Sequence, residues 1–185
     1  MTIEQIKHIQ NRIDTPSDGV WGPKSQAAVK QYLRSLMPAV NPWPTQGNVS
    51  KFFGNAGDES NLTNLDVSHL GVMYEGTVVH TIRCHKLVAN SLGRILNKIY
   101  LSPFKGILEQ YAGCFNNRPM RGGNSYSMHA YGIAIDFDPD TNGMHDKWPV
   151  QATMPLEIME FFAAEGWKSA GANWGFDAMH FQATC

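Results

Sequence analysis

The sequence lacks a strong charge of either sign, long apolar runs and a recognisable export signal. Its 15 Lys and Arg residues and 16 Asp and Glu residues leave a net charge of −1. No global field therefore draws the chain to nucleic acid or to anionic lipid, and we predict no nucleic-acid partner. Its apolar runs are far shorter than the roughly 18–20 residues that span a bilayer, so we predict no membrane anchor. The opening stretch, MTIEQIKHIQNRID, has no basic segment followed by an apolar one, and we expect no signal peptide.

Cysteine is scarce as well, and this limits the kinds of site that the chain can build. Cys84, Cys114 and Cys185 are odd in number, widely separated and free of any C-x-x-C pair. This pattern favours free thiols over a disulfide framework. Any metal site must then use histidine and carboxylate ligands. Hydrophobic residues make up 43% of the 185 residues, which is enough for the core of one domain with a small appendage.

Turn signals and prolines divide the chain into two parts. Isoleucines recur at helical spacing in residues 3–13, and a second helical pattern follows the turn SDGVWGP. The segment MPAVNPWPTQGN holds three prolines and a glycine and is typical of a linker. We predict a short all-helical module at residues 1–37, a linker at 38–48 and a body at 49–185.

The body mixes strand and helix signals, which predicts an α+β fold with a small antiparallel sheet flanked by helices. GVMYEGTVVHTIR predicts a hairpin that turns near Glu75–Gly76. Apolar spacing predicts a helix over residues 84–100 and another in MPLEIMEFFAAEGW, from Pro155 to Gly166. GANWGFDAMHFQ predicts a turn that runs into a last strand.

One predicted strand carries an acid within its apolar run. In SMHAYGIAIDFD, Ile133, Ile135 and Phe137 alternate on one face and Asp136 lies on the other, as in a half-buried strand. A carboxylate among small and branched apolar residues is costly unless a partner or a metal compensates it.

Two histidines and a second acid can provide that compensation. His129 precedes Asp136 by seven residues, and Asp177 and His180 follow in DAMHF. Two imidazoles and one carboxylate are a sufficient ligand set for a catalytic zinc that keeps a position open for water. The spacing allows Asp177 to lie beside the metal and to accept a proton from its water. On spacing alone, a capped strand end with two surface histidines remains the alternative.

A longer pattern joins these residues. RGGNSYSMHAYGIAID followed by EGW and WGFDAMHF closely resembles the family of zinc D-alanyl-D-alanine carboxypeptidases and L-alanyl-D-glutamate endopeptidases. The shared pattern is Ser-x-His-x-x-Gly-x-Ala-x-Asp and a later Asp-x-x-His, and the resemblance covers about residues 70–182. It implies a zinc peptidase that cleaves bacterial cell-wall peptides with one Zn²⁺ ion.

The resemblance also implies roles for individual residues. It makes His129, Asp136 and His180 the zinc ligands. It makes Asp177 the general base, which activates the water and later donates a proton to the leaving amine. These four residues come from the two halves of the shared pattern.

Further residues receive less specific roles. Arg121 matches the arginine that precedes Ser-x-His and would stabilise the oxyanion, with Arg118 as a second candidate. Ser127 would orient the first ligand or contact the substrate. Trp174 is a candidate wall of the substrate pocket, although large aromatic side chains are first of all core residues. Gly132 fits where the chain turns close to the metal, since it has no Cβ.

The N-terminal segment has a resemblance of its own. IKHIQNRIDTPSDGVWGPKSQAAVKQYL is similar to the peptidoglycan-binding helical repeat, which has an Asp-Gly-x-x-Gly-Pro turn before an Ala-Val helix. The resemblance implies that residues 1–37 bind peptidoglycan. The alternative is a helical hairpin that only packs on the body, with Trp21 filling a small core.

The binding module, the peptidase, the expected lack of a signal peptide and the small size together resemble a phage endolysin, and we expect a monomer. Such a protein would stay in the host cytoplasm until lysis and then act on peptidoglycan in the periplasm and cell wall. We expect it to hydrolyse the L-alanyl-D-glutamate bond by zinc-activated water. A D-alanyl-D-alanine carboxypeptidase is the alternative within the class. A non-catalytic wall-binding or virion-structural zinc protein is the alternative from another class.

Overall fold

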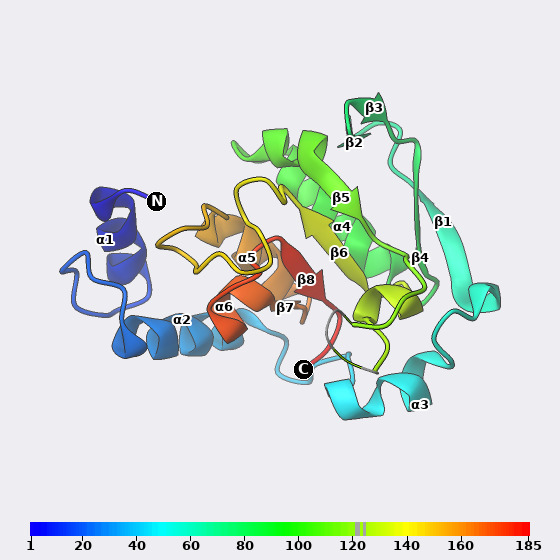
Figure 1. The fold of residues 1–185 in the computed structure, drawn as a ribbon, viewed down its shortest axis with the longest axis horizontal. Helices are drawn as coiled ribbons and strands as arrows, with labels where there is room; N and C mark the ends of the chain where they lie inside the picture. Colours follow the sequence, from blue (N-terminus) through cyan, green and yellow to red (C-terminus); the bar gives the residue numbers. More distant parts are fainter. Residues whose placement is uncertain (121–122, 124) are drawn as a thin grey trace.

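The computed structural model describes residues 1–120, 123 and 125–185 and has a mixed α+β architecture (Figure 1). Six α-helices are found among the described residues: α1 (Ile3–Arg12), α2 (Pro23–Leu36), α3 (Val49–Phe53), α4 (Ala89–Tyr100), α5 (Leu156–Ala164) and α6 (Ala170–Trp174). Short 3-10 helices are η1 (Gln46–Asn48), η2 (Glu59–Asn61), η3 (Lys105–Gln110) and η4 (Met128–Tyr131). The predicted fold class is confirmed, because small antiparallel sheets lie among these helices.

The strands form three antiparallel sheets in the described part of the chain. β1 (Leu62–Asp66) pairs with β4 (Thr81–His85), and β2 (Met73–Tyr74) pairs with β3 (Thr77–Val78). The largest sheet has the order β5-β6-β8-β7, from β5 (Tyr111–Gly113), β6 (Ala134–Phe137), β8 (His180–Gln182) and β7 (Lys168–Ser169). β6 and β8 are its two central strands, and they come from segments far apart in the sequence.

Strand β6 is more deeply buried than the alternating pattern indicates. Ile133, Ile135 and Phe137 are fully buried, as expected, but Ala134 on the other face is fully buried too. The expectation of a half-buried strand was therefore wrong, because the protein covers both faces. Asp136 lies on this second face with only 15% of its side chain exposed, so its burial is a real energetic cost.

The predicted helix over residues 84–100 begins later than the periodicity suggested. Cys84 and His85 end strand β4, and α4 starts only at Ala89. Cys84 and His85 are part of a strand because residues 81–85 pair in full register with β1. The predicted turn at Glu75–Gly76 is confirmed: both residues have positive φ, as the two central residues of a type I′ turn do. Helix α5 also lies where it was predicted, directly after Pro155.

The two N-terminal helices pack against the body, at the end that carries α5 and α6 (Figure 1). Ile9 and Val29 belong to the same continuous core as Phe162 of α5. Arg12 forms two hydrogen bonds with the Glu160 carboxylate, both 2.6 Å long. The division into a module, a linker and a body stays a prediction, and α1 and α2 are joined to the rest by apolar and charged contacts.

A cluster around two tryptophans strengthens this contact. The Trp21 ring meets the buried Trp148 ring edge-on, with centroids 5.1 Å apart. Trp21 Nε1–H donates to Gln26 Oε1 at 3.1 Å, and Gln26 Nε2 donates to the Ala172 carbonyl of α6. Trp21 is thus a packing residue in this structure. In the part of the chain described here, no helix has the length and apolar character that crossing a membrane requires.

Candidate metal centre

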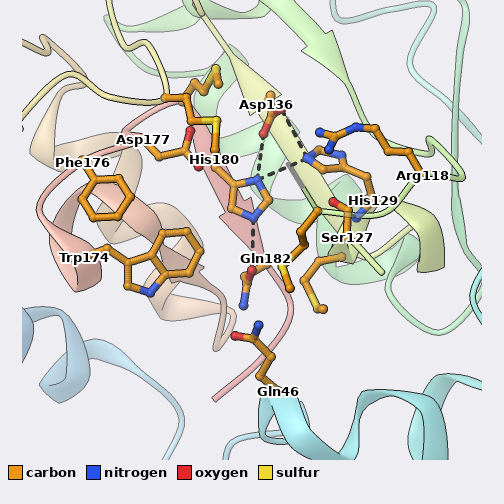
Figure 2. A pocket seen from close by; sticks show the side chains of 14 residues that line it. Gln46, Arg118, Ser127, His129, Asp136, Trp174, Phe176, Asp177, His180 and Gln182 are labelled. Carbon is orange, nitrogen blue, oxygen red and sulfur yellow. Dashed lines mark hydrogen bonds and ion pairs between the residues drawn. The ribbon is translucent and has the colours of Figure 1, made fainter. Parts of the chain in front are cut away.

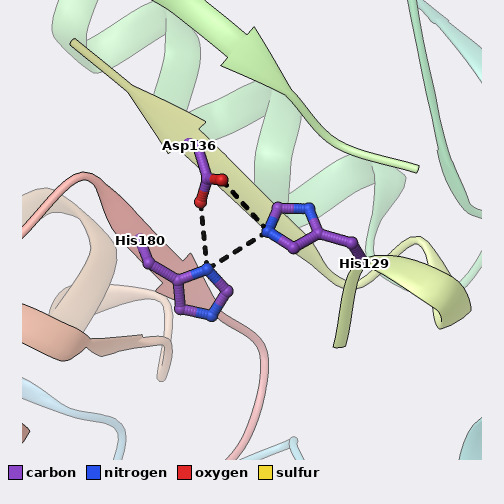
Figure 3. A group of neighbouring side chains, drawn as sticks. All are labelled: His129, Asp136 and His180. Carbon is purple, nitrogen blue, oxygen red and sulfur yellow. Dashed lines mark hydrogen bonds and ion pairs between the residues drawn. The ribbon is translucent and has the colours of Figure 1, made fainter. Parts of the chain in front are cut away.

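The two central strands bring the three predicted metal ligands together. β6 and β8 are antiparallel, and Asp136 lies directly opposite His180. Directly opposed residues of such a pair project from the same face of the sheet. His129 comes from η4, immediately before β6, and its ring turns back over the same face (Figure 3).

The ligand atoms of these residues converge on one point. His129 Nε2 lies 3.2 Å from Asp136 Oδ2, and His180 Nδ1 lies 3.0 Å from Asp136 Oδ1. The two ring nitrogens are 3.2 Å apart, and the whole set of ligand atoms lies within 4.8 Å (Figure 3). Both histidines are buried, at 4% and 8% exposure. The alternative of two surface histidines is therefore excluded.

The contact between Asp136 and His180 shifts the pKa of both side chains. Burial opposes the charged form of Asp136, but the hydrogen bonds from His129 and His180 outweigh it and hold the pKa of this carboxyl well below its usual range. Burial likewise opposes protonation of His180, yet its contact with Asp136 raises the pKa of the ring. Asp136 therefore stays negatively charged inside the protein, and a cation beside it is favourable.

The far nitrogen of each ring also has a partner. His129 Nδ1 lies 2.6 Å from the Cys114 carbonyl, which can only accept, so this nitrogen carries the proton. The bulge between Tyr111 and Gly113 of β5 shifts the register just before Cys114. His180 Nε2 lies 3.1 Å from Gln182 Oε1. With a metal ion bound, both rings can therefore present an unprotonated nitrogen to that ion.

This donor set fits a zinc ion. Two neutral imidazoles and one carboxylate form the protein half of a tetrahedral catalytic site and leave one position for water. Imidazole ligands favour zinc over magnesium or calcium, which prefer oxygen ligands alone. His129, Asp136 and His180 can hold one metal ion.

Asp177 lies in the turn that leads into β8. Its φ of 58° places it in the left-handed region, which is uncommon for a residue other than glycine. The Asp177 carbonyl accepts from His180 N–H at 3.0 Å and closes the turn. The charge of its carboxylate is close enough to contribute to the raised pKa of His180. Strained backbone of this kind concentrates at functional sites.

A cleft of about 300 Å³ opens over the cluster (Figure 2). Ser127 lines it, and Ser127 Oγ accepts from His129 N–H at 3.3 Å, which suits a residue that orients this ligand. Trp174 lines the cleft, is 41% exposed and lies nearly parallel to the His180 ring. Arg118 lines it as well, whereas Arg121 lies outside the described residues.

Sequence reasoning missed five cleft residues, which include Met120 and Met144. Phe176, Gln46 and Gln182 all line the cleft (Figure 2). Phe176 and Gln182 flank the DAMH motif at short distance, so inspection of its neighbours could have found them. Gln46 belongs to the predicted linker, and no sequence signal connects it with the site.

The structure corrects the reason given for Gly132. Its φ of 68° requires the left-handed region, as a turn glycine would. An added Cβ would lie 2.8 Å from Leu62 Cδ2 and 2.9 Å from the His85 nitrogen. The close neighbour is therefore the β1–β4 pair, and the glycine lets η4 pack against that sheet.

The surface is hollowed on more than one side of the cluster. Asp136 lines the cleft with Trp174, and it also lines two hollows beside the β2–β3 hairpin. These hollows share Tyr74 and Tyr111, whose ring centroids are 6.2 Å apart. Space for a bound chain thus exists in two directions from the metal ligands.

Comparison with protein families gives one match. Residues 121–183 match the model of a family described as D-alanyl-D-alanine carboxypeptidase, over about a third of the chain. Searches of curated proteins and of solved structures found no match. The matched segment contains the three candidate metal ligands and Asp177, and it supports a zinc peptidase that acts on peptidoglycan peptides.

Proposed function

We propose that this chain is a zinc endopeptidase that hydrolyses the L-alanyl-D-glutamate bond in the stem peptide of bacterial peptidoglycan. The observation that carries the proposal is the convergence of His129, Asp136 and His180 at the floor of a cleft that Asp177 also lines. A structural zinc site needs neither an open cleft nor a carboxylate beside its ligands. The same features argue against the alternative of a non-catalytic zinc protein.

The residues of the cleft divide the chemistry among them. A bound zinc ion supplies Lewis-acid activation of water and of the scissile carbonyl. Asp177 accepts the proton of the attacking water and passes it to the leaving amine. Arg118 lines the same cleft and can stabilise the negative charge that develops on the carbonyl oxygen, the role that the resemblance gives to Arg121. Trp174 offers an apolar wall to the substrate.

The preference for an internal bond rests on the shape of the surface. A carboxypeptidase needs room for one residue beyond the scissile bond, whereas an endopeptidase needs room for chain on both sides. Asp136 lines both the hollows beside the β2–β3 hairpin and the cleft beside Trp174, which supports room for chain on both sides of the metal ligands. Cleavage between D-alanine residues is the alternative, and it agrees with the description of the matching family as D-alanyl-D-alanine carboxypeptidase.

Replacement of Asp177 by asparagine tests the mechanism. The amide keeps the size and the left-handed backbone preference of the side chain but cannot accept the proton. We expect hydrolysis of purified peptidoglycan to fall about 10²–10⁴-fold while the zinc content stays at one ion per chain. Asp14→Asn is the matched control, since Asp14 also has a left-handed φ, of 54°, and lies in the N-terminal turn. Undiminished hydrolysis by the Asp177 variant would refute its role as base.

Mass spectrometry of the released fragments separates the two bonds. An L-alanyl-D-glutamate endopeptidase leaves a new amino-terminal D-glutamate, whereas a carboxypeptidase releases free D-alanine. We expect the first product from intact stem peptides. Free D-alanine as the sole product would support the carboxypeptidase. It would contradict the inference that the hollows hold substrate chain on both sides of the scissile bond.

We also infer that the protein acts as a monomeric phage endolysin whose first 37 residues bind peptidoglycan. The support is the resemblance of this segment to the peptidoglycan-binding repeat. An adsorption assay on purified sacculi tests it with Val20→Asp, because Val20 lies in the turn between α1 and α2 and is 68% exposed. Reduced adsorption with unchanged hydrolysis of a soluble muropeptide is expected, and unchanged adsorption would count against binding through this turn.

A further inference from the structure

Gln182 is a buried polar residue that neither the family pattern nor the proposed chemistry uses. It follows His180 by two residues in β8, so both side chains project from the same face of the sheet. Only 2% of its surface is exposed. Figure 2 shows its amide directly below the His180 ring, on the side away from Asp136.

The contacts of this amide form a chain of hydrogen bonds. Gln182 Oε1 lies 3.1 Å from His180 Nε2, and Gln182 Nε2 donates to Thr184 Oγ1 at 2.7 Å. Thr184 is fully buried, so water does not replace this bond. In the structure the oxygen of Gln182 faces the His180 ring, and its amide nitrogen faces Thr184.

The orientation of the amide decides which nitrogen of His180 carries the proton. An accepting oxygen at Nε2 favours the tautomer with the proton on Nε2 and a free lone pair on Nδ1. Nδ1 is the atom that faces Asp136 and His129, at 3.0 Å and 3.2 Å. A histidine that binds a metal through one nitrogen generally donates the other N–H to such a partner, which fixes both the tautomer and the orientation of the ring.

The two histidines are oriented by partners of different kinds. The partner of His129 is the main-chain carbonyl of Cys114, which every residue type would provide at that position. The partner of His180 is a side chain, and it is held in turn by a second side chain. The orientation of His180 therefore depends on the identity of two residues that contact no metal ligand atom.

We propose that Gln182, supported by Thr184, is a positioning residue that holds His180 with Nδ1 available to the zinc ion. The proposal rests on the proposed zinc site but not on the identity of the bond that is cleaved. It assigns Gln182 a role in metal affinity, and it separates Gln182 from the cleft residues that contact the substrate.

Zinc affinity of the purified protein, measured by competition with a chromogenic chelator, tests the proposal without any substrate. Gln182→Met keeps the length of the side chain but removes the acceptor, and we expect the affinity to fall about 10–100-fold. Gln182→Glu keeps an acceptor and should hold zinc at least as tightly as the parent. Thr184→Val removes only the support of the amide and should weaken binding several-fold.

A matched control distinguishes positioning from a general loss of stability. Gln10 is a second buried glutamine, 1% exposed, with hydrogen bonds to Asp18, Val20 and Ser25 in the N-terminal helices. Gln10→Met should lower the unfolding temperature and leave zinc affinity unchanged. The absorption spectrum of the cobalt-substituted protein gives a second measure, and it should change in Gln182→Met but not in Gln10→Met.

The possible outcomes separate this proposal from the proposed function. If Gln182→Met binds zinc within twofold of the parent, the positioning role is wrong. The same holds if only the KM for a muropeptide changes, because Gln182 would then be a substrate contact. Should Gln182→Met fail to fold, Gln182→Glu and Thr184→Val decide, since equal losses in both would contradict the predicted order. A parent protein that binds no zinc would overturn the proposed function and the positioning role together.

Discussion

Gln10 in the N-terminal helices and Asp136 in the central sheet are both buried polar side chains, and their surroundings differ in kind. Around Gln10, donors meet acceptors: its Nε2 donates to three oxygens, and its Oε1 accepts from Gly19 N–H. Around Asp136, the neutral tautomers of His129 and His180 would direct lone pairs at a carboxylate, so a proton or a metal ion must lie between them. The His129 and His180 nitrogens that face the carboxylate are those whose opposite nitrogens already have acceptor partners.

The difference separates a structural network from a ligand site. A hydrogen-bond network in which every donor has an acceptor stabilises the fold and needs no bound ligand. A set of lone pairs directed at one point is unfavourable until a proton or a metal ion occupies that point. The polar contacts of Gln10 are therefore satisfied within the protein, whereas His129, Asp136 and His180 form a group that can hold a cation.

Removal of residues 1–37 should have the largest effect. Helix α2 covers α5 and α6, and Ile9 and Val29 lie in the common core. We expect the remaining chain to lose cooperative unfolding in urea, because so much apolar surface becomes exposed. A truncated protein that unfolds at the temperature of the full chain would show that residues 38–185 form an independent domain.

A point substitution tests the same contact with less damage. Leu33 is 3% exposed and Leu36 is 37% exposed, on the same helix. Leu33→Ala should lower the free energy of unfolding by about 2–5 kcal/mol. Leu36→Ala should change it by less than about 1 kcal/mol. Equal effects of the two substitutions would contradict the shared core.

Removal of the metal should affect the other region selectively. A ligand present at a thousand times its dissociation constant stabilises a protein by about 4 kcal/mol, which corresponds to an unfolding temperature about 10 °C higher for a chain of this size. Chelation should reverse this gain. Hydrogen exchange should then rise in residues 128–136 and 177–184 and stay unchanged in α1 and α2. Equal changes in both regions would show that the two are coupled more tightly than their networks suggest.

The smallest expected effect concerns His85, an imidazole outside the ligand cluster. Its Nε2 donates to the Phe53 carbonyl at 3.0 Å and its Nδ1 accepts from Leu87 N–H at 3.1 Å, so the neutral ring is fully paired. Burial lowers the pKa of His85. The unfolded chain therefore binds a proton below a pH of about 6.5 when the folded chain does not, and folding loses stability as the pH falls.

His85→Asn should remove this contribution. The stability of the metal-free protein, measured in urea at pH 7.5 and pH 5.5, should fall less with acid in the variant than in the parent. An identical fall in both proteins would show that His85 does not contribute to the pH dependence.

Sequence analysis named three residues that lie together in the structure, but it placed the start of a neighbouring helix wrongly. Spacing made His129, Asp136 and His180 candidates, the family resemblance implied their role as ligands, and the structure brings them together. Their proximity follows from antiparallel pairing of β6 and β8, which local pattern cannot show. The start of α4 was missed because apolar spacing in residues 84–88 fits a helix as well as a strand, and only the partner strand β1 decides.

Other features depend on distant contacts and could not be read from the sequence. Gln46 lines the cleft, although its segment has the composition of a linker. Gly132 is required by the neighbouring sheet and not by the metal. In both cases the deciding partner lies far away along the chain.

The direct pairing of Asp136 with His180 has a consequence for how the protein reaches its native state. A slip of one residue between β6 and β8 would send these two side chains to opposite faces of the sheet. Misaligned molecules would then be unable to capture the ion, and only correctly aligned ones would be locked by it. Zinc binding would in this way favour the native alignment of β6 and β8 during folding, before any substrate is bound.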